Sequence, residues 1–158
     1  DLKSYKKSLC NNSNPFTPAV NLVFALDESL KMMREEGLEK IFLRHNKHKL
    51  AISKAIKELN LKLFADDQSL SPAITAIETE NINAEDFRKT IKDEFDILLA
   101  GGQDHLKGKI FRIGHLGYVN DKDIISIISA ISYVLLDKNK ITSEQAGSAL
   151  IAARNELR

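Results

Sequence analysis

The chain has 158 residues, of which 43% are hydrophobic and 28% are charged, so it is long enough to bury the core of one globular domain. Its 23 basic and 22 acidic side chains give a net charge of +1, which argues against nucleic acid or a membrane surface as a partner selected by bulk charge. The single cysteine, Cys10, excludes an internal disulfide and favours a reducing, cytoplasmic location.

Residues 1–14 are polar and lack an apolar period, so we expect a loop or linker there. The sequence opens on Asp1 without an initiator methionine, and we interpret residues 1–14 as a linker from an N-terminal domain outside the chain. Residues 15–137 are predicted to form one domain, and residues 138–158 add a further C-terminal helix.

A helix is predicted from Pro18 to about Glu36, followed by Gly37 as its stop. Its apolar residues recur every three or four positions, at Leu22, Leu26, Leu30 and Met33. Thr17 precedes the proline and is therefore predicted to be the helix N-cap. A hydroxyl beside the free amides of a helix N-terminus also suits a phosphate group, so capping and phosphate binding both stay open for Thr17.

A second helix is predicted after Gly37, with an apolar stripe that runs from Leu38 to Leu59. His45 lies on this stripe, where a lone histidine is more often a packing residue than a ligand. We expect His48 to be solvated, together with the basic residues of a solvent-exposed face, Arg44, Lys47 and Lys49.

Strands are predicted over residues 61–65, 73–79 and 97–100, and a helix after Asn83 separates the second from the third. Asp66 and Asp67 are interpreted as turn residues, because no further carboxylate or histidine lies at metal-ligand spacing. The apolar stretch from 124 to 136 contains three serines and is too short to span a membrane, so we predict a buried helix over Asp121–Asp137.

One predicted strand carries a charge at its centre. Gly108–Gly117 has the sequence GKIFRIGHLG, in which β-branched and aromatic residues surround Arg112. Side chains alternate along a strand, so Phe111 and Ile113 share one face and Arg112 shares the other with Gly114, which leaves open space. A guanidinium in such a recess suits bidentate pairing with a carboxylate or phosphate. The strand alone does not decide between a structural ion pair across the sheet and an anion-binding role.

The order of these elements predicts an α/β (α+β) fold with two layers. We expect a mixed, largely antiparallel sheet of about four strands, with helices packed over one face.

The stretch from Gly101 to Gly117 resembles the closing motif of the class-V aminotransferases. It consists of Gly101-Gly102-Gln103, a short polar loop and the run KGKIFRIGHLG. These pyridoxal-phosphate (PLP) enzymes include serine–pyruvate and alanine–glyoxylate aminotransferases and proteins called the small subunit of soluble hydrogenase. The resemblance runs from about Asp1 to about Leu136 and implies the C-terminal small domain of a fold-type I PLP transferase.

The resemblance implies roles for two residues. In the family the arginine of this strand binds the α-carboxylate of the substrate, which implies that role for Arg112. The matching threonine reaches across a homodimer interface to the cofactor phosphate, which implies cofactor binding by Thr17. The parent enzyme would move an amino group from serine- or alanine-type amino acids to glyoxylate- or pyruvate-type 2-oxo acids.

The family's cofactor lysine stands in a Ser-x-Lys-Gly setting, which this chain lacks. We therefore expect the fragment alone to bind neither PLP nor a metal and to be inactive. Two alternatives stay open. The chain could be a free-standing α/β module that binds an anionic metabolite or a protein partner through Arg112, or an interaction subunit, although one cysteine cannot hold a metal cluster. The coding sequence upstream of Asp1 would discriminate between a module and a fragment.

Overall fold

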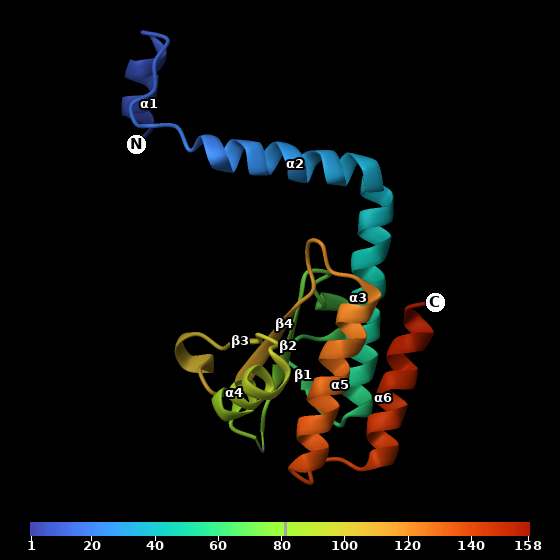
Figure 1. Cartoon of the computed structure of the whole chain (residues 1–158). Coiled ribbons are helices and arrows are strands. Elements are labelled where there is room, and N and C mark those ends of the chain that lie inside the picture. Colours follow the sequence, from blue (N-terminus) through green and yellow to red (C-terminus); the bar gives the residue numbers. More distant parts are fainter. Residues whose placement is uncertain (81) are drawn as a thin grey trace. The chain divides into compact units, whose positions relative to one another are not determined.

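The computed structural model describes residues 1–80 and 82–158. Along the chain lie α1 (Leu2–Leu9), α2 (Val20–Glu36), α3 (Leu38–Glu58), β1 (Lys62–Leu63), β2 (Ile74–Glu78), α4 (Ala84–Phe95), β3 (Ala100–Gly101), β4 (Ile110–Gly114), α5 (Asp121–Asp137) and α6 (Ser143–Glu156) (Figure 1). The chain divides into two compact units, Asp1–Ile41 and Phe42–Arg158. Within the described residues, none of the helices combines the length and the apolar character that crossing a bilayer requires.

The first unit begins with a helix where the sequence predicted a loop. The side chain of Asp1 accepts a hydrogen bond from the Lys3 amide at 2.9 Å, and Lys6 and Lys7 lie in the last turn of α1. An acidic cap at the start and basic residues at the end both suit the helix dipole. The prediction of a loop was therefore wrong for Leu2–Leu9.

Helix α2 begins later than predicted, so Thr17 does not cap it. Its N-cap is Ala19, which has no capping side chain, because a turn in which the Val20 amide donates to the Pro18 carbonyl (2.9 Å) comes before the helix. The helix ends at Gly37 as predicted. Gly37 has φ of 87°, a conformation that glycine adopts without strain, and its amide donates to the Met33 carbonyl at 2.9 Å.

The second unit contains a four-stranded sheet in the order β1-β2-β4-β3. The central pair, β2 and β4, is in register from Ile74 opposite Gly114 to Glu78 opposite Ile110. Every strand pair in the described residues is antiparallel. The prediction of a largely antiparallel sheet of about four strands is confirmed, although no parallel pair among these strands makes the sheet mixed. The outer strands β1 and β3 have only two residues each, which is shorter than predicted.

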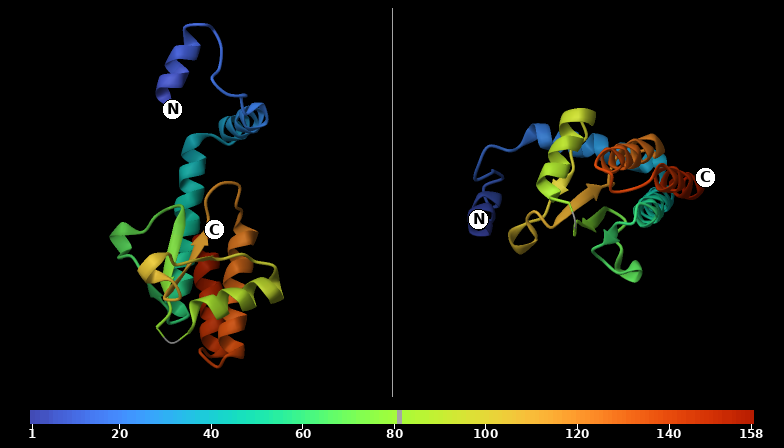
Figure 2. Two further views of the ribbon diagram at one scale, coloured as in Figure 1. Left: turned by 90° about the vertical axis from the view of Figure 1, so that its left-hand side faces the viewer. Right: turned by 90° about the horizontal axis from the view of Figure 1, so that it is seen from below.

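One face of the sheet is covered by helices, which confirms the predicted two-layer arrangement. Ile77, Phe111 and Ile113 point to this face, are at most 1% exposed and share one core with apolar side chains of α3, α4, α5 and α6. Helices α3, α5 and α6 run side by side, and α4 runs across their direction (Figures 1 and 2). Phe87 of α4 joins the two layers, because its ring centroid lies 5.1 Å from that of Phe111.

The C-terminal helix α6 packs on α5 through small side chains. Ala149 and Ala153 are fully buried, and α6 is in contact with α5. A capping box begins the helix: the Thr142 hydroxyl accepts from the Gln145 amide (3.2 Å), and the Gln145 side chain accepts from the Thr142 amide (2.9 Å).

Thr142→Ala is expected to lower the free energy of unfolding by about 1 kcal/mol, because the Gln145 amide loses its acceptor. Urea denaturation of the chain measures this loss. Ser143→Ala, at the next and equally exposed position, is the matched control and is expected to change stability little. Equal losses in both variants would show that the cap contributes nothing specific.

Candidate functional site

Arg112 lies at the middle of β4, on the sheet face that points away from the helices. Its neighbours along the strand, Phe111 and Ile113, are buried in the core, whereas Arg112 is half-buried. The residues opposite Arg112 are Ala76 on β2 and Ala100 on β3. Small side chains on both flanks leave room around the guanidinium group.

The guanidinium of Arg112 is held at one point. Its Nε donates to the Gly101 carbonyl at 2.9 Å. Among the described residues, Arg112 forms no ion pair with a carboxylate, and its two terminal nitrogens have no hydrogen-bond acceptor. A Cβ atom added at Gly114 would meet nothing within 4 Å, so the predicted open space beside Arg112 is present. The outer edge of the guanidinium is thus available for a bidentate anion.

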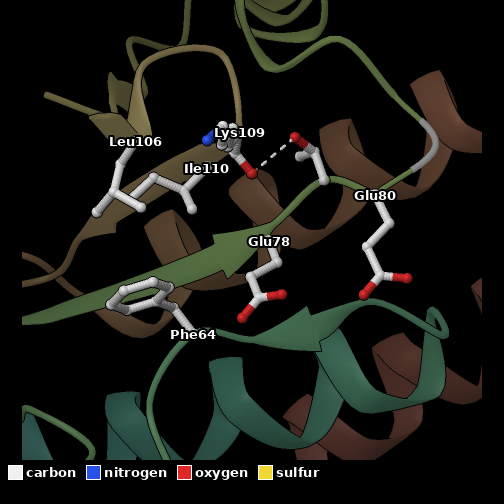
Figure 3. A pocket seen from close by; sticks show the side chains of 7 residues that line it. Phe64, Glu78, Glu80, Leu106, Lys109 and Ile110 are labelled. Atoms are coloured by element: carbon white, nitrogen blue, oxygen red, sulfur yellow. Dashed lines mark hydrogen bonds between the residues drawn. The ribbon is translucent and has the colours of Figure 1, made fainter. Parts of the chain in front are cut away.

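A hollow of ≈ 420 Å³ lies on the same unit but does not include Arg112. Phe64, Leu106 and Ile110 line one end of it and the carboxylates of Glu78 and Glu80 lie at the other (Figure 3). Thr79, which also lines the hollow, donates from its hydroxyl to the Lys109 carbonyl at 3.0 Å. Glu78 pairs with Lys62 at 2.9 Å and Lys109 also lines the hollow, so the charge of its lining is mixed. No arginine among its described lining residues offers a planar fork to an anion, as Arg112 does.

Thr17 lies in the first unit, and its side chain is exposed. Its hydroxyl does not cap α2, and the amides of Leu22 and Val23 both donate to the Ala19 carbonyl, at 3.0 and 3.1 Å. The predicted combination of a capping hydroxyl with free helix amides is therefore absent. A hydroxyl without a capping partner still fits a phosphate oxygen, so the cofactor role of Thr17 stays a prediction.

A buried polar cluster, which the sequence analysis did not predict, lies between α3 and the residue that directly follows β4. His48 and His115 are both fully buried. His48 Nε2 lies 2.9 Å from Asp121 Oδ1, and His115 Nε2 lies 2.9 Å from the hydroxyl of Thr75. The Nδ1 atom of each ring has no hydrogen-bond partner within the described part of the chain. The prediction that His48 is solvated was wrong, although its spacing of four residues from buried Ile52 indicates the core-facing side of α3.

The basic residues of α3 hold the loop between β4 and α5. Arg44 Nη1 donates to the carbonyls of Gly117 (2.9 Å) and Val119 (3.0 Å). The Gly117 amide donates to His45 Nε2 at 3.1 Å, and Lys47 pairs with Asp121 at 3.0 Å. The face of α3 that was predicted to be only solvated therefore binds the loop between β4 and α5, which directly follows the strand of Arg112.

Burial controls the charge of the two buried histidines. Burial is the largest cause of the low pKa of His115, about 4, and the nearby His48 and His45 contribute to the same shift. Burial also lowers the pKa of His48, against the opposing effect of Asp121. For Asp121 burial raises the pKa, but hydrogen bonds from His48 and Lys47 outweigh it and the net shift is downward. Both histidines are therefore neutral at pH 7.

The described residues contain no group of three His, Cys, Asp or Glu side chains that could hold a metal ion. The candidate site is thus an arginine at the centre of a paired strand, with an open outer edge. Such a guanidinium can bind a carboxylate or a phosphate in bidentate fashion.

Known proteins similar to the chain are found by sequence and by structure, although no family model matches it. The soluble hydrogenase 42 kDa subunit of Anabaena cylindrica is 50% identical over 154 residues, which cover 98% of this chain and 40% of that protein. Serine–glyoxylate aminotransferase of Methylorubrum extorquens is 32% identical over 161 residues, covering 100% of this chain and 39% of that protein. The crystal structure of ureidoglycine–glyoxylate aminotransferase from Bacillus subtilis matches with a TM-score of 0.84 and 34% identity, over 92% of this chain and 38% of that one.

The fold is that of the small domain of PLP-dependent aminotransferases. By sequence and structure together, the homologues of the chain are class-V aminotransferases. It spans about two fifths of the length of the curated relatives it matches. The predicted family resemblance is confirmed, and the soluble-hydrogenase name recurs among the relatives.

Proposed function

We propose that the chain is the small domain of a PLP-dependent transaminase that moves an amino group from a serine- or alanine-type amino acid to a glyoxylate- or pyruvate-type 2-oxo acid. The observation that supports this most directly is the guanidinium of Arg112, which has one backbone contact and an open outer edge. The names of the serine–glyoxylate and ureidoglycine–glyoxylate relatives favour glyoxylate as the acceptor.

In this proposal Arg112 binds the α-carboxylate of each substrate in turn. Amino acids and 2-oxo acids both carry a carboxylate next to the carbon that reacts, so one arginine serves both halves of the reaction. Two terminal N–H groups donate to the two carboxylate oxygens, and the bond from Nε to the Gly101 carbonyl fixes the plane of the guanidinium. The carboxylate then positions the α-carbon for reaction.

PLP, when bound, supplies the electron sink for the amino transfer. We assign Thr17 to the cofactor phosphate, because its exposed hydroxyl does not cap α2 and suits a phosphate oxygen. The ring of the cofactor also requires a lysine, an aspartate and an aromatic side chain. In this proposal these three groups belong to a further domain outside this chain. We propose that the chain alone is inactive, and that Thr17 serves the site of the other subunit in a homodimer.

The test is the coding region upstream of Asp1 and the activity of the polypeptide that it encodes. We expect an in-frame segment with a Ser-x-Lys-Gly site, and a purified protein that binds PLP and forms glycine from glyoxylate with serine or alanine as donor. The chain from Asp1 to Arg158 alone is the matched control and is expected to give no glycine. A start codon directly before Asp1 would reject the proposal in favour of a free-standing anion-binding module.

A further inference from the structure

The orientation of Arg112 depends on the position of one carbonyl group. Gly101, which accepts from Arg112 Nε at 2.9 Å, ends β3. This strand has two residues, lies at the edge of the sheet and, among the described strands, pairs with β4 alone. A strand of that length contributes few ladder hydrogen bonds. The Gly102 amide, in the same peptide unit as the Gly101 carbonyl, donates to the Ile110 carbonyl of β4 at 3.2 Å, and contacts from outside the sheet add to this pairing.

Helix α4 supplies such contacts through Arg88. Its Nε donates to the Leu99 carbonyl at 2.8 Å, and its Nη1 pairs with Glu85 at 2.7 Å. The guanidinium lies directly against β3, because a Cβ atom added at Gly101 would lie 2.5 Å from Arg88 Nη1 and 2.9 Å from Glu85 Oε1. Gly101 therefore leaves the space that the Arg88–Glu85 pair occupies.

The helix that carries Arg88 is itself fixed to the strand that carries Arg112. Phe87 is 1% exposed, and its ring packs at 5.1 Å on Phe111. Phe111 is in turn the residue opposite Gly101 in the β3–β4 pair. Arg88 thus links a rigid helix to the backbone on which the orientation of Arg112 depends.

We propose that Arg88, braced by Glu85, is a positioning residue for Arg112. It holds the backbone at Leu99–Gly101, and the Gly101 carbonyl then sets the plane in which Arg112 presents its terminal nitrogens to a carboxylate. Only the effect on substrate affinity rests on the proposed function. The effect on the orientation of Arg112 is measurable on the full 158-residue chain without substrate.

The first measurement is hydrogen exchange at the Arg112 Nε–H group, followed by NMR on ¹⁵N-arginine-labelled chain. In Arg88→Ala we expect exchange about tenfold faster, the factor that the loss of one net hydrogen bond corresponds to. Lys89→Ala is the matched control: Lys89 is the next residue of α4, is exposed and has no side-chain hydrogen bond to the described residues. It removes the same charge and should leave the exchange rate unchanged.

Arg88→Lys separates geometry from charge. Lysine keeps the charge but cannot donate to the Leu99 carbonyl and to Glu85 from one rigid plane, so we expect it to leave Arg112 as mobile as alanine does. Glu85→Gln is a milder change that keeps the helix intact and should give a smaller acceleration. Unchanged exchange in Arg88→Ala, or full restoration by Arg88→Lys, would overturn the positioning role.

The second measurement is steady-state kinetics in the transaminase that carries this domain. Arg88→Ala should raise the KM for the amino donor about tenfold, with a smaller change in kcat. The double variant Arg88→Ala/Arg112→Ala should have the same KM as Arg112→Ala, because both residues act through one contact. If Arg112→Ala raises the KM and Arg88→Ala does not, this inference fails and the proposed function stands. If Arg112→Ala leaves the KM unchanged, the proposed carboxylate-binding role of Arg112 fails, whatever the exchange rates show.

Discussion

Replacing Arg112 with alanine is expected to raise the KM for both the amino donor and the 2-oxo acid about a hundredfold in the transaminase that carries this domain. A bidentate, charge-assisted hydrogen-bond pair contributes about 3 kcal/mol, and each 1.4 kcal/mol corresponds to about a factor of ten. Both substrates should be affected alike, because each offers the same carboxylate. Initial-rate measurements that vary one substrate at a time give the two constants.

Two further variants show whether the loss comes from the guanidinium of Arg112. Arg112→Lys keeps the charge without the planar fork, so we expect an intermediate rise in KM. Arg154→Ala removes an exposed arginine from α6 and should leave both constants unchanged. Normal KM values in Arg112→Ala would remove the carboxylate-binding assignment, even if the protein proves to be a transaminase.

The strand that carries Arg112 could be predicted from the sequence, because its buried and open faces alternate with a period of two. The openness of Arg112 could not be predicted from that strand. It depends on Ala76 and Ala100, which the register of the sheet places on the two sides of Arg112. It also depends on Gly101, whose carbonyl accepts from Nε and leaves the two terminal nitrogens of Arg112 without an acceptor among the described residues. These residues are distant from Arg112 in the sequence, so their contact with it can be predicted only when the pairing of the strands is known.

Two of the predictions that failed concern a helix cap and the burial of a side chain. A capping threonine before a proline is a statistical preference, and at Thr17 the turn at Pro18 displaced the start of the helix. His48 was interpreted by its polar neighbours in sequence, whereas its burial depends on the loop and on Asp121, which lies 73 residues further along the chain. Long helices with a strong apolar period, such as Asp121–Asp137, were predicted with their bounds, because burial and period agree there.

Acid is expected to destabilise the domain through His115. Its ring is fully buried, and burial together with the nearby His48 and His45 lowers its pKa from 6.5 to about 4. Between these pH values the unfolded chain binds a proton that the folded chain does not, so the free energy of unfolding falls as the pH falls. Above pH 6.5 the contribution of neutral His115 to the free energy of unfolding is fully present. It declines by about 1.4 kcal/mol per pH unit, which amounts to about 3 kcal/mol at pH 4.

The neighbouring groups do not reverse this sign. The lowered pKa of His48 acts in the same direction. Asp121 also has a lowered pKa, but a carboxylate of that kind loses its stabilising effect only as the pH falls below its ordinary value of 3.8, outside the window of His115. The window from pH 6.5 to pH 4 therefore reports mainly on the two buried histidines.

Urea denaturation at several pH values between 7.5 and 4 tests this assignment with two glutamine variants. His115→Gln is expected to be less stable at pH 7.5, because the ring packing and the contact with Thr75 are lost. The free energy of unfolding of this variant should nevertheless change less with pH than that of the parent chain. The difference in slope corresponds to about one bound proton. His105→Gln, at an exposed position, should retain the parent's dependence. If His115→Gln kept the full dependence, the buried proton site would have to be sought at His48, since a group that has been removed cannot titrate.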